Sequence, residues 1–138
     1  MKRFINWSIF YAVAGLAAGV FYREFTKLNG FADFTSLGKV HGHLFVLGMV
    51  MFLIVALFSV KFDLAKEKGF SWFMGLYNAG LLLSVVMMIV RGITQVKGIL
   101  LSSMANGMIS GFAGLGHIAM GAGLLVLLFV LRKLADNA

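Results

Sequence analysis

The chain has 138 residues, of which 61% are hydrophobic, and it contains neither proline nor cysteine. Soluble domains are roughly 45 to 50% apolar, so a water-soluble fold of this length is excluded. The 12 Lys and Arg residues outnumber the 5 Asp and Glu, but they are scattered at the ends of apolar stretches. This scatter argues against nucleic-acid binding and favours contact with anionic lipid headgroups. The lack of cysteine excludes disulfides, iron–sulfur clusters and thiolate metal sites.

Four apolar stretches are long enough to cross a membrane, which takes about 20 helical residues. The first, residues 4–22, follows "MKRF" and resembles the start of a signal peptide, but we expect it to be retained as a span. The others are residues 37–60, 70–90 and 110–131, separated by charged loops. The sequence therefore predicts an all-α polytopic membrane protein, with one four-helix transmembrane bundle over residues 1–138.

The distribution of basic residues predicts the orientation. Seven of them flank one side of the predicted bundle and five the other, which favours cytoplasmic termini in a bacterial inner membrane. The stretch 91–109 would then lie outside. It is half apolar, so we expect it to lie in the membrane interface or to fold over the bundle as a lid.

All three histidines fall inside predicted spans. His41 and His43 lie in "KVHGHLFVLGMV" near the start of the second span, and His117 lies near the start of the fourth. These two spans run in the same direction. At a rise of about 1.5 Å per residue, His41 is roughly 6 Å and His117 roughly 10 Å below the helix starts, so one cofactor could contact both spans.

No carboxylate lies within a span, although proton-coupled exporters generally need one there. A single histidine within a membrane often only forms a hydrogen bond between helices. Three histidines at one level of the membrane instead indicate that they bind a cofactor. His41 and His43 are about 200° apart around a helix, so they cannot chelate one ion together. Copper or zinc, bound by the same imidazoles, is the competing hypothesis.

Haem fits histidines that lack acidic or thiolate neighbours, because its iron takes neutral imidazole and its macrocycle prefers an apolar slot. Gly114 and Gly121 share the helical face of His117, where a planar macrocycle could lie, although close helix packing explains such glycines equally well. Lys39 and Arg91 fall on the histidine side and could hold the propionates.

The segment "HGHLFVLGM", with Gly48 seven positions after His41, resembles the histidine helices of the haem–copper oxidase superfamily and of the related nitric-oxide-response membrane haem proteins. Together with "GLGHIAMG", the whole chain is similar to a family of small four-helix bacterial membrane proteins of uncharacterised function. In the oxidases a His-x-His helix serves two haems through opposite faces. The resemblance implies those roles for His41 and His43, and a homotrimer of this unit. The chain lacks the adjacent histidines and the tyrosine of an oxygen-reducing centre, so oxygen reduction is not implied.

We therefore expect a haem b protein for electron transfer or for gas or redox sensing. His41 and His117 are the favoured axial pair, because Phe45 and Gly48 continue the face of His41. A pair formed by His43 with His117, or by His41 and His43 of different chains, remains open. The alternative functions are a haem-free channel or transporter component, a copper or zinc protein, and a structural partner subunit.

Overall fold

The computed structural model describes residues 1–137, which form helices and connecting turns without any strand. Four segments are long and apolar enough to cross a membrane, so the chain is a multi-pass membrane protein and the all-α prediction is confirmed. The second of these segments is built from three helical pieces. A short 3₁₀ turn precedes the third membrane-spanning segment. The elements are α1 (Lys2–Leu28), α2 (Leu37–His43), the π-helix η1 (Leu44–Val50), α3 (Met51–Lys61), η2 (Leu64–Lys66), α4 (Lys68–Val96) and α5 (Ser103–Asp136).

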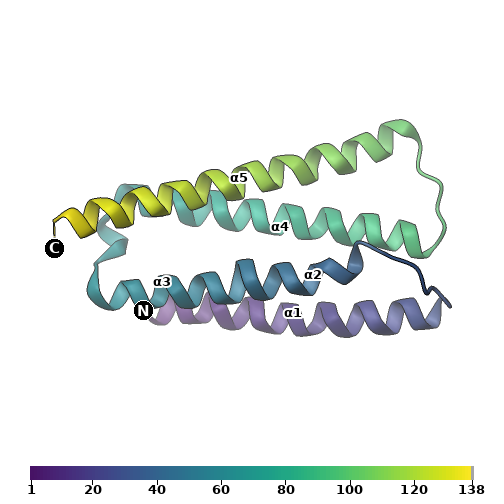
Figure 1. Cartoon of the computed structure of the whole chain (residues 1–138), viewed down its shortest axis with the longest axis horizontal. Helices are drawn as coiled ribbons and strands as arrows, with labels where there is room; N and C mark the ends of the chain where they lie inside the picture. Colours follow the sequence, from purple (N-terminus) through teal and green to yellow (C-terminus); the bar gives the residue numbers. More distant parts are fainter. Residues whose placement is uncertain (138) are drawn as a thin grey trace.

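The helices are arranged as two antiparallel pairs with both termini at the same end (Figure 1). One pair is α1 with the α2–η1–α3 segment, and the other is α4 with α5, which share the most extensive contact in the molecule. The two pairs meet mainly where α2 packs against α4. Because α5 packs chiefly on α4, much of its remaining surface faces outward.

The connection between α4 and α5 is shorter than the sequence indicated. It comprises residues 97–102 only, so the predicted loop over residues 91–109 is wrong in its bounds, because α4 and α5 extend into that stretch. That the connection lies in the membrane interface stays a prediction. Both α4 and α5 extend into the stretch predicted as a loop, because backbone groups of a helix pair with each other inside the helix. The Ser102 hydroxyl caps the start of α5 by accepting from the Ala105 N–H at 3.2 Å. Arg91 bridges the two helices by donating to Ser110 Oγ at 2.7 Å.

Small residues let α4 and α5 approach closely. A Cβ added to Gly116 would collide with Ser84 Oγ and would lie 2.9 Å from the carbonyl oxygen of Gly80. One added to Gly123 would lie 2.8 Å from the backbone nitrogen of Tyr77. Membrane helices associate through such packing, since lipid offers little hydrophobic drive for helix pairing.

The π-helix η1 keeps one face of the second span in contact with the core. The residues Val40, Leu44, Gly48 and Phe52 are all buried, at intervals of four. In a regular α-helix each such step turns the face by about 40°, and the wider π turn offsets this drift. Side chains from neighbouring helices satisfy carbonyls of the π segment: Tyr77 Oη donates to Leu47 at 2.9 Å, and Ser8 Oγ donates to Met49 at 2.9 Å.

The orientation stays a prediction that cysteine labelling can test. With cytoplasmic termini, cysteines at Asn29 and Asn106 lie outside, since both positions are at the end of the bundle opposite the termini. We expect an impermeant thiol reagent to label both in intact cells, whereas Asp63→Cys, in the turn on the terminal side, reacts only after lysis. The reverse pattern would place the termini outside.

Candidate functional site

His43 and His117 come together between the two helix pairs. Their ring centres lie 6.2 Å apart with the planes nearly perpendicular, at 88°. His43 is at the end of α2 and His117 is in the first half of α5, and both α2 and α5 pack on α4. Two histidines 74 positions apart in the sequence are thereby neighbours at one level of the bundle.

Both rings are held by the helix that carries them. His43 Nδ1 lies 3.0 Å from the carbonyl oxygen of Lys39, and His117 Nδ1 lies 2.8 Å from that of Ala113. A carbonyl oxygen can only accept, so each Nδ1 carries the proton and donates it. In this tautomer Nε2 carries the free lone pair, which is the atom that could bind a metal ion.

The separation of the two rings is compatible with a single metal ion between them. Two imidazoles on opposite sides of one ion place Nε2 about 2 Å from it and the ring centre about 1 Å further, so the centres are about 6 Å apart. The observed 6.2 Å agrees with this value. His43 and His117 are therefore the two side chains that could hold such an ion in common.

Open space flanks His117 along its helix. No atom lies within 4 Å of where a Cβ would be at Gly114 or Gly121, one turn to either side of the histidine. Gly42, beside His43, is equally open. The tight packing on α4 comes instead from Gly116 and Gly123. Gly114 and Gly121 therefore leave a flat, uncovered surface next to the imidazole.

His41 occupies the opposite face of the second span. Its Cβ and Cγ lie 3.9 Å from the Cβ position of Gly19 on α1, and its ring centre is 6.4 Å from that of Phe45. Its Nδ1 is buried without a hydrogen-bond partner among the described residues. The sequence analysis placed the two histidines on opposite faces but favoured His41 as the partner of His117; the structure brings His43 there instead.

Gly48 does not reach the histidine pair. A Cβ at this position would collide with the Tyr11 ring, so the glycine serves the contact between η1 and α1. Its position one turn beyond Phe45 was the reason for choosing His41. That face packs on α1, where the Phe45 ring lies against Gly15.

Two cations lie near the level of the histidines. Arg91 lies where α4 meets α5 and donates to Ser110 Oγ and to the carbonyl oxygen of Asn106, the latter at 3.4 Å. Ser110 is seven residues before His117, which is about 10 Å along α5. Lys39 is one turn before His43, and its ammonium lies over the Phe34 ring at 5.1 Å. Both can hold an anionic group at the rim of the site.

Ser84 of α4 is a site residue that the sequence analysis missed. It is fully buried, and its Oγ lies 3.4 Å from His117 Nδ1. The hydroxyl thus supports the ring from the side of α4. The sequence does show that Ser84 lies seven residues before Arg91 and therefore on the same face of the helix. That spacing points to the site only once this face is known to pack against α5.

The donor set limits the kinds of metal site that one chain can form. Residues 1–137 contain no group of three or more histidine, cysteine, aspartate or glutamate side chains placed to hold an ion. A structural zinc site takes four protein ligands and a catalytic one takes three. Haem supplies four nitrogen ligands itself and needs only one or two from the protein, so a histidine pair suits it better.

These features define a polytopic four-helix membrane protein with a histidine pair between its two helix pairs. The chain belongs to the family described as "Protein of unknown function (DUF2871)", whose model matches residues 1–134. No curated protein and no solved structure matches it. The expected membership of a small four-helix family is confirmed, while the similarity to haem–copper oxidases and nitric-oxide-response haem proteins stays a prediction.

Proposed function

We propose that this chain is a b-type haem protein of the bacterial inner membrane, with His43 and His117 as axial ligands. The observation that carries the proposal is the pair itself, with ring centres 6.2 Å apart and both Nδ1 atoms bonded to helix carbonyls. Bound haem would supply a one-electron redox couple within the membrane. The chain's own part is to orient the two imidazoles and to place cations at the rim.

The surroundings of the pair support haem over a small ion. The uncovered faces at Gly114 and Gly121 provide room for a planar group beside His117. Arg91 and Lys39 are the cations that would pair with its propionates. Zinc would need a third ligand from another chain, because no group of three ligand side chains occurs within residues 1–137.

Ligation by two histidines favours electron transfer, or sensing through a displaceable ligand, over catalysis, since the iron keeps no open position. We also propose that copies associate, as the resemblance to a third of an oxidase core implies. His117 is exposed in the single chain, and an imidazole facing lipid is costly. A homotrimer would cover this side of α5.

The second candidate function is a haem-free channel or transporter component. Its support is the buried Nδ1 of His41, a half-buried imidazole at the α1–α2 contact whose Nδ1 has no hydrogen-bond partner among the described residues. The two functions differ in a property that is simple to measure, because only the first requires a chromophore.

A visible spectrum tests the proposed function. We expect protein purified in detergent from cells with ample haem to show a Soret band, and a sharp α band after reduction with dithionite. The chain has no cysteine for covalent attachment, so acid acetone should extract the chromophore. Colourless protein from haem-replete cells would refute the haem proposal, and a chromophore retained after extraction would refute its non-covalent attachment.

A further inference from the structure

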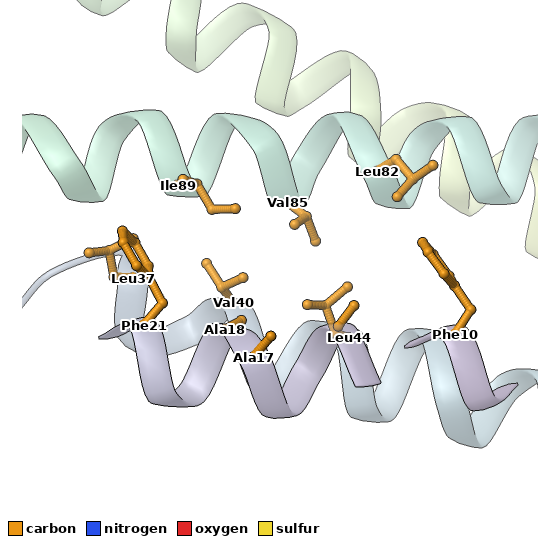
Figure 2. A pocket seen from close by; sticks show the side chains of 11 residues that line it. Phe10, Ala17, Ala18, Phe21, Leu37, Val40, Leu44, Leu82, Val85 and Ile89 are labelled. Atoms are coloured by element: carbon orange, nitrogen blue, oxygen red, sulfur yellow. The ribbon is translucent and has the colours of Figure 1, made fainter. Parts of the chain in front are cut away.

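An apolar groove runs along the side of the molecule between α1 and α4, away from the histidine pair. It has a volume of about 370 Å³, and Figure 2 shows its two walls and its floor. Alanines at three positions of α1 leave the space open, and the opposite wall comes from α4. Every lining residue is apolar: Phe10, Ala14, Ala17, Ala18, Phe21, Leu37, Val40, Leu44, Leu82, Val85 and Ile89.

A second hollow adjoins the groove at the end nearest the N-terminus. Phe10 and Leu82, which face each other at one end of the groove in Figure 2, also line this hollow. Its other lining residues are Arg3, Asn6 and Trp7. The surface thus changes along α1 from a purely apolar channel to a cavity with a cation and an amide at its rim.

The charge at this rim indicates what the groove binds. Within residues 1–137, the Arg3 guanidinium forms no ion pair or hydrogen bond. It lies at the start of α1, where a span emerges at headgroup level, and Trp7 is the residue type that anchors that level. A free cation there complements a phosphate, and the groove beside it complements a hydrocarbon chain.

We propose that this surface is a binding site for one anionic phospholipid, with its phosphate at Arg3 and Asn6 and one acyl chain in the groove. One water molecule needs roughly 10 to 15 Å³ of such open volume, so the groove of about 370 Å³ has room for a ligand much larger than a water molecule. Its wholly apolar lining favours a hydrocarbon chain over a polar group. The site is independent of the proposed haem, since none of its lining residues belongs to the histidine pair.

Fluorescence quenching by brominated lipid tests the site directly. The chain has two tryptophans, and Trp72 is exposed, so Trp72→Phe leaves Trp7 as the only emitter. In vesicles of phosphatidylcholine, we expect brominated phosphatidylglycerol to quench Trp7 with an association constant about fivefold above that of brominated phosphatidylcholine, since one basic residue near the surface contributes about that factor. Arg3→Gln should remove the preference, and the matched variant Lys2→Gln should keep it.

The groove itself is tested by filling it. Ala17→Leu should reduce quenching by the anionic lipid at least twofold, whereas Ala122→Leu, an exposed position on α5 outside the groove, should leave it unchanged. Equal losses in Arg3→Gln and Lys2→Gln would show diffuse surface attraction and overturn the proposal. Unaltered quenching in Ala17→Leu would do the same. Trp7 that no brominated lipid quenches would show that a second copy covers the groove, which also overturns it.

Discussion

His43→Ala and His117→Ala are each expected to abolish the low-spin haem spectrum completely, while His41→Ala retains it. The first two side chains face each other with ring centres 6.2 Å apart, whereas His41 lies against Gly19 on the far side of the second span. Loss of either axial imidazole leaves the iron with one protein ligand and a changed spin state. The reduced-minus-oxidised spectrum, normalised to protein, measures the effect.

His41→Ala is the matched control in this series, because it removes an imidazole from the same turn of helix. Two other outcomes carry information. Loss of haem in both second-span variants but not in His117→Ala would mean that His41 and His43 of different chains share the haem. Full spectra in all three variants would leave the histidines as polar struts between helices and would reject the ligand assignment.

Gly116→Ala is expected to destabilise the bundle although it adds only one methyl group. The added Cβ would collide with Ser84 Oγ and crowd the carbonyl oxygen of Gly80, so α5 must move away from α4. Overpacking of this kind costs about 1 to 3 kcal/mol, which exceeds the gain of about 1 kcal/mol in helix propensity. Because His117 is the next residue, haem affinity should fall together with stability.

Gly111→Ala is the matched control, since its Cβ would meet no atom within 4 Å on the same helix. Thermal unfolding in detergent, followed by circular dichroism, should show a lower midpoint for Gly116→Ala only. A lower midpoint in both variants would show that the two glycines act through a common contact, such as one with a second copy. Equal and unchanged midpoints would refute the tight α4–α5 seam.

The fold could be predicted because composition and span length constrain it strongly. An apolar stretch of about 20 residues has few alternatives to a membrane helix, and the four stretches all became spans. The ends of the spans were less predictable, since helix continues into the interface wherever its backbone groups stay paired. Thus α5 begins at Ser103, well before the predicted residue 110, and much of the expected loop was part of α4 and α5.

The level of the histidines was predictable, but the choice between His41 and His43 was not. In a membrane both faces of a span are apolar, so periodicity does not show which face meets which neighbour. Phe45 and Gly48 were interpreted as the walls of a cleft beside His41. They instead pack on Gly15 and Tyr11 of α1. Only the arrangement of α1, α4 and α5 around the second span determines that His43 faces His117.

The π-helix η1 divides the second span into two halves. The rotation of one half relative to the other about the helix axis depends on how many residues η1 contains. The half before it carries the histidines, and the half after it carries Phe52, which stacks on Tyr11 in the aromatic core. Each residue removed from or added to this segment rotates one half against the other by about 100°. The number of residues between Leu44 and Val50 therefore determines the direction in which His43 points around the helix axis. Deleting one residue there would turn the imidazole away from His117 without replacing any residue that contacts either ring.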